Sequence, residues 1–205
     1  MARRLSVSTV LGILLFIAFF DNFTQIPMIS PYATFELGAS AVMAGWIVGI
    51  YSLTNMLGNV GAGWVLDKMG RRVPLAVGLI WAGLGVWLYG VVGTPLGLLG
   101  ARAFHGLGGS ILVPAIFTLA ADLLSEDNRG AGMGRIGAMI GLAAIAGPMF
   151  SGIVRQLYGP HAVFTSVFVL MFLGGLYALT LPETLSRRSK GTEEKEKGSI
   201  PIPFS

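Results

Sequence analysis

The stretch GWVLDKMGRRV, residues 63–73, places a cluster of charge between two long apolar runs. Its charged residues are Asp67, Lys68, Arg71 and Arg72, with Gly70 among them. If both runs are helices, Asp67 lies at the C-terminal end of one and the arginines lie at the N-terminal start of the next. Each charge then meets the like-signed end of its own helix dipole, which is the unfavourable placement. Local capping does not explain the cluster, and its partners are expected elsewhere in the chain.

The amino-acid composition indicates whether the chain is surrounded by water or by lipid. Hydrophobic residues make up 54% of the 205 residues, and charged residues make up only 12%. Soluble domains usually carry about 25% charged residues. The sequence therefore predicts a membrane protein in contact with the lipid bilayer.

Six apolar stretches are long enough to cross a bilayer as helices. They are Val7–Ser30, Ala41–Leu66, Val73–Val92, Pro95–Leu124, Ala131–Gln156 and His161–Leu181. A spanning β-barrel would need short alternating strands, and runs such as VSTVLGILLFIAFF (7–20) do not alternate. We expect an all-α membrane protein with one six-helix transmembrane bundle over residues 1–185. Residues 186–205 have too little apolar content to pack and are expected to form a disordered cytoplasmic tail.

The positions of lysine and arginine predict the orientation. With a cytoplasmic N-terminus, twelve of the fourteen Lys and Arg residues fall on the inner side, while Arg155 falls outside and Arg102 lies within a span. The positive-inside rule then places both termini in the cytoplasm, and we expect the membrane to be the cell membrane. The basic composition is explained by topology, so no nucleic-acid partner is expected.

An internal repeat relates the two halves of the chain. A shift of 89 residues lays GNVGAGWVLDKMG (58–70) over GPMFSGIVRQLYG (147–159) and pairs Gly63 with Gly152. An offset of three helices inverts the second copy in the membrane, and its loop accordingly lacks the basic residues of the first. We expect two inverted three-helix repeats, about 7–92 and 95–181, a construction common in transporters with sites near the membrane midplane.

Four motifs resemble those of the major facilitator superfamily. GWVLDKMGRR matches the signature between its second and third helices, through Gly63, Asp67, Lys68, Gly70, Arg71 and Arg72. LGARAFHGLGG (99–109) resembles the fourth-helix pattern, with Arg102 in the arginine place and His105 where glutamine is more usual. GLAAIAGPMFSG (141–152) resembles the fifth-helix antiporter motif through Gly141, Gly147, Pro148 and Gly152, although Ala143 and Ser151 replace glycines. FFDNFTQIP (19–27), with Asp21, is similar to the first-helix motif of twelve-helix drug:proton antiporters.

The resemblance covers one half of such a transporter and implies a second six-helix half, supplied by a second copy or by another chain. It also implies that the 63–72 signature latches the two halves together on the cytoplasmic side. Within this chain, Asp122 and Glu126 are the expected complements of the arginines. Arg129 or the N-terminus of another helix is the expected complement of Asp67.

Asp21 and Arg102 are the clearest charges inside the spans, where each would cost about 2.5–3.5 kcal/mol on insertion scales. Counted along their helices, both lie about 10 Å from the outer edge of the hydrocarbon core. A pair at one level could hold Asp21 ionised in one state and release it to take a proton in another, since a nearby cation favours the charged carboxylate and burial disfavours it. The alternatives are a static ion pair, or an Arg102 that reaches outward to the interface.

Other polar side chains in the spans have two possible uses. His105 lies one turn from Arg102 and could join a proton path or pack as a hydrogen-bonded histidine. Asn22, Gln25 and Asn55 could contact substrate or bond between helices. Close packing alone could explain the glycines of the fifth span. The sequence has no cysteine and only two histidines far apart, so neither a metal nor another cofactor is expected.

Two function classes follow. The first is proton-coupled efflux of small, amphipathic or drug-like molecules by alternating access, driven by the proton gradient. The second is a non-transporting half-length fragment or assembly module that binds a partner half. An enzyme is not expected, because no span carries paired carboxylates, a nucleophile with its base, or a metal-ligand cluster.

Overall fold

The structure, a computed structural model, describes residues 7–125 and 129–183. Every regular element in these ranges is helical. The elements are α1 (Val7–Pro31), the π-helical turn η1 (Tyr32–Glu36), α2 (Ala41–Met69), α3 (Arg72–Tyr89), α4 (Pro95–Gly109), α5 (Leu112–Leu123), α6 (Arg129–Tyr158) and α7 (Pro160–Ala178). Within the described ranges, six helical segments are long and apolar enough to cross a membrane. The six predicted spans are confirmed, and the predicted tail, 186–205, lies outside the described residues.

The fourth span differs from the prediction because it is broken into α4 and α5 at Ser110 and Ile111. Pro114 has no backbone N–H, so it cannot donate to the Ser110 carbonyl one turn earlier. The hydrogen bonds between residues four apart end in α4 with the Ser110 N–H, which donates to the Gly106 carbonyl at 3.1 Å. They begin again in α5 with the Ala115 N–H, which donates to the Ile111 carbonyl at 3.0 Å. A discontinuous span is typical of transporter helices that border a binding site.

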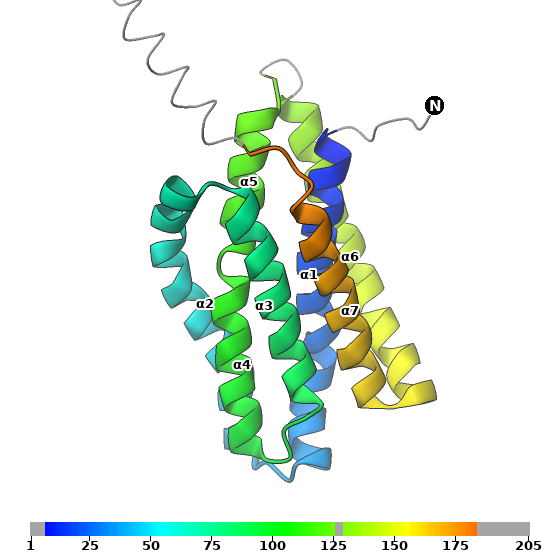
Figure 1. Cartoon of the computed structure of the whole chain (residues 1–205). Coiled ribbons are helices and arrows are strands. Elements are labelled where there is room, and N and C mark those ends of the chain that lie inside the picture. The colour runs from blue at the N-terminus through cyan, green and yellow to red at the C-terminus, as the bar shows by residue number, and fades with distance from the viewer. Residues whose placement is uncertain (1–6, 126–128, 184–205) are drawn as a thin grey trace, which may run out of the picture.

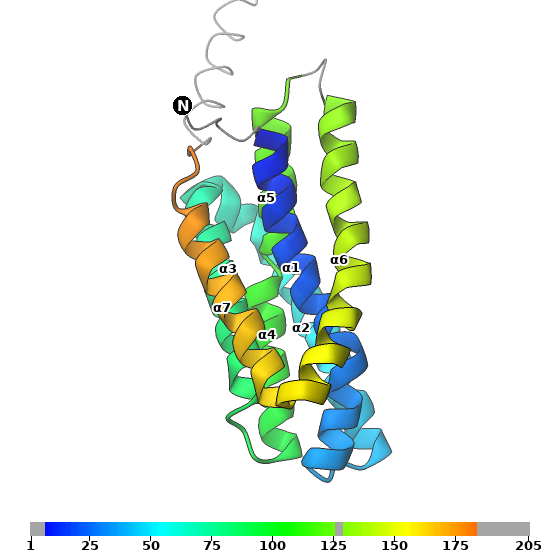
Figure 2. The ribbon, with the colours of Figure 1, turned by 90° about the vertical axis from the view of Figure 1, so that its right-hand side faces the viewer.

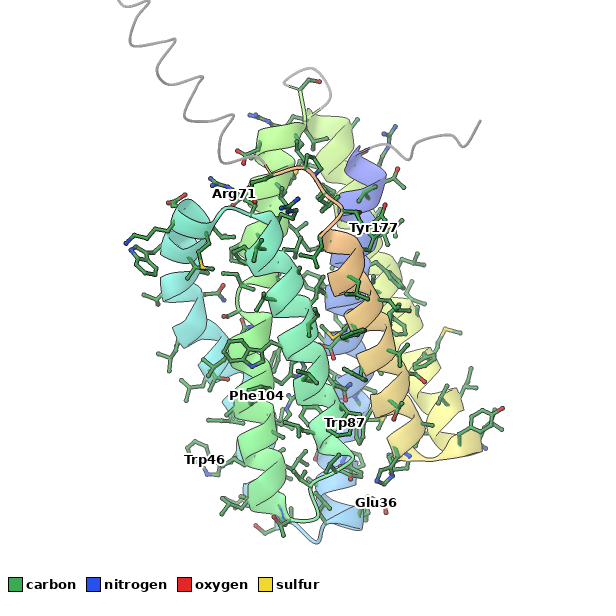
Figure 3. All side chains as sticks on the ribbon, in the orientation of Figure 1. Glu36, Trp46, Arg71, Trp87, Phe104 and Tyr177 are labelled. Carbon is green, nitrogen blue, oxygen red and sulfur yellow. The ribbon has the colours of Figure 1, made fainter. Side chains whose placement is uncertain are left out.

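The helices run alternately up and down the bundle. Figure 1 shows the start of α1, the α2–α3 loop, the end of α5 and the end of α7 at one end of the molecule. Figure 3 labels Arg71 at that end and Glu36 at the opposite end. The cluster around Arg71 therefore lies on the side where the chain begins.

The contacts between helices have the symmetry of an inverted repeat. In such a repeat, α1 corresponds to the α4–α5 span, α2 to α6 and α3 to α7. The packing of α1 on α6 then corresponds to the packing of α4 on α2, and both contacts are extensive. Under the same exchange, the contact of α3 with α7 maps onto itself. Figure 2 shows α1 beside α6 and α7 beside α3. Two inverted three-helix repeats are confirmed as the architecture.

Burial is distributed unevenly among the spans. In their most apolar windows, 61% of the first span is buried, against 17% of α2 and 22% of α6. Large apolar side chains are exposed on both of these helices, among them Trp46 and Trp64 on α2 and Ile145 and Met149 on α6. Trp46 points away from the bundle in Figure 3. The core thus lies along α1, α3 and α4–α5, and α2 and α6 each keep an open face.

Candidate functional site

A chain of polar side chains is buried in the middle of this core. His105 on α4 meets Asp21 on α1, with its Nε2 atom 2.8 Å from Asp21 Oδ2. Its other nitrogen, Nδ1, lies 2.5 Å from the hydroxyl of Tyr89 on α3. All three side chains are buried. The imidazole therefore bridges a carboxyl group and a phenol between three helices.

Arg102, one turn before His105 on α4, continues the chain. Its Nη1 donates to the Tyr89 hydroxyl at 3.3 Å. Its other donors bond backbone carbonyls of α2, with Nε donating to Ile47 O at 3.2 Å and Nη2 to Val48 O at 3.4 Å. The guanidinium is held inside the bundle, so the alternative in which Arg102 reaches outward to the interface is wrong.

The expected direct pair of Asp21 with Arg102 is replaced by a longer connection. Asp21 Oδ2 contacts His105 Nε2, and Arg102 joins through the phenol of Tyr89. Both residues belong to one hydrogen-bonded chain, which runs through His105 and Tyr89. Counting along the helices predicted equal depths for Asp21 and Arg102. It could not predict which side of α1 Asp21 lies on, and in the structure its carboxyl group faces His105.

Tyr51 on α2 closes the cluster on the side of Arg102. Its ring faces the guanidinium at 4.7 Å from the centroid, a cation–π contact, and lies 4.8 Å from the His105 ring. Its hydroxyl accepts a hydrogen bond from Asn22 Nδ2 at 2.5 Å. Tyr51 therefore connects the buried cluster to the surface that Asn22 lines.

A cavity of about 420 Å³ lies next to Tyr51, between α1, α2 and the break of the fourth span. Asn22, Tyr51, Asn55 and Asn59 supply its polar wall, and Phe19, Leu112, Val113 and Pro114 supply much of its apolar wall. Asn55 Nδ2 also donates to the Gly106 carbonyl at 3.3 Å, and Asn59 Nδ2 donates to Asn55 Oδ1 at 3.1 Å. The structure thus places Asn22 and Asn55 at a cavity.

Gln25 lies one turn beyond Asp21 on α1 and does not line this cavity. Its side chain is buried, and neither amide atom has a hydrogen-bond partner among the described residues. The Thr24 hydroxyl and Asp21 Oδ1 share this condition. One helical turn of α1 therefore carries several buried polar atoms without a protein partner, which is unusual in folded proteins.

The charged cluster of the opening stretch forms an ion network at the end of the bundle where the chain begins. Arg71 is buried, with Nε 3.4 Å from Asp122 Oδ2 and Nη2 3.5 Å from Asp67 Oδ1. Its Nη1 also donates to the Leu66 carbonyl at 3.1 Å. The expected pairing of the arginines with Asp122 is confirmed for Arg71. Glu126, the other expected partner, lies outside the described residues.

Glu183 is the member of this network that the sequence reasoning missed. Its carboxylate accepts the backbone N–H of Arg71 at 3.0 Å and that of Arg72 at 3.3 Å, at the N-terminus of α3. A carboxylate at this position offsets the unfavourable meeting of two arginines with the positive end of the helix dipole. Gly70 makes room for it, because its φ is +83° and a Cβ there would collide with the Glu183 carboxyl group.

The remaining residues of the signature have separate surroundings. Asp67 pairs with Arg71 rather than Arg129 and is 70% exposed at its side chain. Arg129 Nη2 donates to the Ala121 carbonyl at 3.4 Å. Lys68 lies over the Trp64 ring at 4.3 Å, and Arg72 Nη1 donates to the Leu181 carbonyl at 3.5 Å. A Cβ on Gly63 would meet nothing within 4 Å of the described chain.

The antiporter motif divides between two faces of α6. A Cβ on Gly147 would lie 2.9 Å from the Thr24 backbone nitrogen, so this glycine permits the close approach of α1. Gly134, Gly137, Gly141 and Gly152 have no neighbour within 4 Å in the described chain. Of these five glycines, close packing inside this chain therefore explains Gly147. The other four belong to the open face of α6, and Pro148 lies inside the same helix.

Among the described residues, no group of three or more His, Asp or Glu side chains could hold a metal ion. The buried cluster contains one carboxyl group, one imidazole, one guanidinium and two phenols. Such a set can donate and accept hydrogen bonds, and its imidazole and carboxyl group are the two members with a site for an additional proton.

Tyr89 and Tyr51 were missed by sequence reasoning, which considered only charged and amide side chains. A buried phenol normally finds a hydrogen-bond partner. A tyrosine within a span, such as Tyr51, or at the end of one, such as Tyr89, at the level of a charge is the signal that could have found them. For Glu183, the signal was an acidic residue directly after the last span, on the side of the arginines.

Comparison with known proteins gives the relatives. A family model described as Major Facilitator Superfamily matches residues 11–204. "Inner membrane transport protein YajR" of Escherichia coli (strain K12) is 30% identical over 200 residues, which are 95% of this chain and 42% of that protein. "Multidrug resistance protein 1" of Bacillus subtilis (strain 168) is 26% identical over 183 residues, which are 89% of this chain and 47% of that protein. The chain spans less than half the length of each.

A solved structure has the same fold. A crystal structure of the peptide transporter POT in complex with sulfate superposes with a TM-score of 0.77 and 22% sequence identity. The match covers 93% of this chain and 43% of that chain. At this identity the likeness establishes the arrangement of the helices, and it carries no statement about what this chain binds.

Proposed function

This chain belongs to the Major Facilitator Superfamily, and on that premise we propose that it is one six-helix half of a proton-coupled exporter. The cargo would be small amphipathic or drug-like molecules, exchanged for protons by alternating access. Two bundles must rock about a central site for this mechanism, so a second half is needed. The curated relatives have about twice the length of the matched region, which supports a partner half from a second copy or from a separate chain.

The observation that carries the proposal is the buried cluster of Asp21, His105, Tyr89 and Arg102 next to the 420 Å³ cavity. A charge at the centre of a span costs about 2.5–3.5 kcal/mol on insertion scales. Such residues in transporters usually lie on an ion or proton pathway. In the proposed cycle, Asp21 takes up a proton from one side of the membrane and releases it to the other.

The lining of the cavity supports the class of cargo. Its polar side chains are the amides of Asn22, Asn55 and Asn59, the phenol of Tyr51 and the hydroxyl of Ser110, and none of the described residues that line it is charged. Amides and a phenol can donate and accept hydrogen bonds with a neutral ligand. Phe19, Leu112 and Val113 offer apolar contact. A molecule with an apolar body and a few hydrogen-bonding groups fits this combination.

The network around Arg71 is proposed as the latch of this half, on the cytoplasmic side of the cell membrane. In this arrangement both termini are cytoplasmic, in line with the distribution of lysine and arginine. The Asp67 side chain, 70% exposed at the end of α2, would meet a helix of the partner half. The open faces of α2 and α6 support the same assignment of the surface that a partner half would cover.

The test is efflux by the full chain in reconstituted vesicles. Ethidium, a fluorescent amphipathic dye, would be loaded into vesicles and its loss followed under an imposed proton gradient, with and without a protonophore. We expect efflux that stops when the gradient collapses. The mass of the protein in nanodiscs is measured on the same preparation, since two six-helix units are required.

The alternative, a half-length module that binds a partner without transport, is favoured by the same open faces of α2 and α6. It predicts association without any efflux that depends on the gradient. A strictly monomeric chain without efflux would contradict the exporter.

A further inference from the structure

The hydrogen-bond partners within the buried cluster determine where its hydrogen atoms lie. Arginine has only donors, so the Tyr89 oxygen accepts the bond from Arg102 Nη1. The Tyr89 hydroxyl is then left to donate, and His105 Nδ1 lies 2.5 Å away. If Nδ1 accepts, the proton of a neutral imidazole is on Nε2, from which it is donated to Asp21 Oδ2 at 2.8 Å. The bonds form one directed series from the guanidinium to the carboxylate.

We propose that Tyr89 is a positioning residue that keeps His105 neutral, and that the exchanged proton is therefore carried by Asp21 on Oδ1. The inference rests on the proton coupling proposed above and assigns the atom that takes the proton. Tyr89 acts through the imidazole and contacts neither proton nor cargo.

The first reason is the hydrogen-bond count at Tyr89. A proton on His105 Nδ1 would make that nitrogen a donor toward the phenol oxygen. The oxygen would then face two donors, Arg102 Nη1 and His105 Nδ1, and the phenol O–H would lose the acceptor it has now. A buried donor without an acceptor is strongly disfavoured. Protonation of His105 is therefore opposed by the bond that Arg102 makes to Tyr89.

The second reason is electrostatic. Arg102 is three residues before His105 on the same helix and bonds the phenol that touches its Nδ1. An imidazolium would place a second cation next to the guanidinium in a medium of low dielectric constant, where like charges repel strongly. Binding the proton at Asp21 places it on the far side of the imidazole and converts an anion to a neutral group.

The third reason is the state of Asp21 Oδ1. Oδ2 accepts from His105, whereas Oδ1 is buried and has no hydrogen-bond partner among the described residues. It therefore has a lone pair open to a proton. The Thr24 hydroxyl and the Gln25 amide, also buried and without a partner there, lie within the next turn of α1. Groups of this kind in folded proteins are satisfied by internal water, which can deliver a proton.

The other groups near the site do not change this assignment. Tyr51 from α2 faces the imidazole, and its hydroxyl is bonded by Asn22. On α6 and α7, which also pack against α1, Arg135 contacts Ser8 and His161 contacts the Tyr32 ring. Arg155 lies in the last turn of α6. None of these three has a hydrogen bond or ion pair to Asp21 in the described chain.

The step balances as one proton transfer. On uptake, a proton from water forms a bond to Asp21 Oδ1 and the carboxylate becomes a carboxylic acid. The Nε2–H of His105 continues to donate to Oδ2, which is now the carbonyl oxygen. On release, the O–H bond breaks, the proton returns to water on the other side, and the carboxylate re-forms.

The test reads protonation directly in the full chain in nanodiscs, so it does not depend on transport. Infrared difference spectra follow the carboxylic acid C=O band, with Asp21→Asn to identify the Asp21 contribution. Nitrogen-15 NMR of labelled histidine reports the charge and tautomer of His105, with His161 as the internal reference. Tyr89→Phe removes the hydroxyl, and Tyr51→Phe is the matched control in the same cluster.

As the pH falls, we expect the parent protein to gain the Asp21 acid band while His105 stays neutral with Nδ1 as an acceptor. Because the repulsion from Arg102 remains, Tyr89→Phe should shift the assignment: a His105 imidazolium signal should appear at a pH where the parent shows none, with a weaker Asp21 band. Tyr51→Phe should give the same His105 and Asp21 signals as the parent. An imidazolium in the parent while Asp21 remains ionised would overturn the proposal, even if Tyr89→Phe fails to fold. An unchanged assignment in Tyr89→Phe would also overturn it. An Asp21 band without proton-driven efflux would refute the exporter and leave the assignment in place.

Discussion

Replacement of Gly70 by alanine tests the network that joins the α2–α3 loop to the end of the bundle. Gly70 has φ +83° and ψ −174°, a region that is essentially restricted to glycine and costs about 1–3 kcal/mol for other residues. The new Cβ would also displace the Glu183 carboxylate, which accepts the N–H groups of Arg71 and Arg72. Hydrogen bonds to a charged group contribute about 1.5–3 kcal/mol in protected sites.

Partial solvent access at Glu183 lowers the second contribution to about 1 kcal/mol. We therefore expect Gly70→Ala to reduce the free energy of unfolding by about 2–4 kcal/mol. Gly63→Ala is the matched control, because Gly63 lies in the same motif, in helix α2, with nothing within 4 Å of its Cβ position. Alanine is favoured over glycine in helices by up to about 1 kcal/mol, so this variant should be neutral or slightly more stable.

The assay is reversible unfolding in mixed micelles with increasing SDS, followed by the fluorescence of the four tryptophans. If Gly70→Ala and Gly63→Ala unfold at the same SDS fraction, the strain at Gly70 and the role of Glu183 are both refuted. If Glu183→Ala equals Gly70→Ala in its effect, the carboxylate contributes most of the loss, and backbone strain contributes little.

Further predictions concern Glu183 and Asp122 in the same network and the glycines of α6. Glu183→Gln should lower the free energy of unfolding by about 1 kcal/mol in the same SDS titration, since a neutral amide is a weaker acceptor for the α3 N-terminus; equal midpoints would exclude this cap. Gly147→Val should cost about 1–3 kcal/mol through overpacking against α1, whereas Gly141→Val, on the open face of α6, should leave the unfolding of this chain within about 0.5 kcal/mol. Loss of dimer or partner binding in Gly141→Val, measured as nanodisc mass, would locate the partner half on α6. Asp122→Ala should destabilise the chain by about 1–3 kcal/mol because the buried Nε of Arg71 loses its carboxylate partner; an unchanged SDS midpoint would show that Asp67 and the Leu66 carbonyl suffice for Arg71.

Much of the fold could be predicted because a bilayer allows few solutions. Backbone groups in lipid must be satisfied within the segment, so long apolar runs become helices, and basic residues set their direction. The break at Ser110 and Ile111 was not predicted. Pro114 follows the glycine-rich stretch GLGGS (106–110). Glycine and proline are both frequent in membrane helices, and proline is tolerated there when neighbours satisfy the freed carbonyl, so these residues did not identify the break.

The charged residues of the candidate site could be predicted from the sequence, but the hydrogen bonds between them could not. Asp21, Arg102 and His105 stand out because charge is rare inside a span, and counting along the helices placed Asp21 and Arg102 at the same depth. Depth gives no direction around the helix axis, so the sequence could not show that His105 lies between the carboxyl group and Tyr89. Tyrosine in a span resembles any apolar aromatic residue until a partner for its hydroxyl is known.

In the ion network at the α2–α3 loop, one partner of Arg71 could likewise be predicted from the sequence and another could not. Asp122 could be predicted as a partner of Arg71, since both lie at the same membrane face. Glu183 could not, because it follows the last helix and is 112 residues from Arg71. Its role depends on where the end of α7 returns to the bundle, and this position is set by packing rather than by hydropathy.

Proton movement by the reconstituted protein decides whether Asp21 couples protons to transport. A pH-sensitive dye, pyranine, would be enclosed in vesicles that contain the full chain, and ethidium would be added outside without an imposed gradient. We expect ethidium to drive a pH change inside the vesicles with the parent protein, and no change with Asp21→Asn at equal incorporation. A pH change of the same size with Asp21→Asn would contradict the proposed role of Asp21.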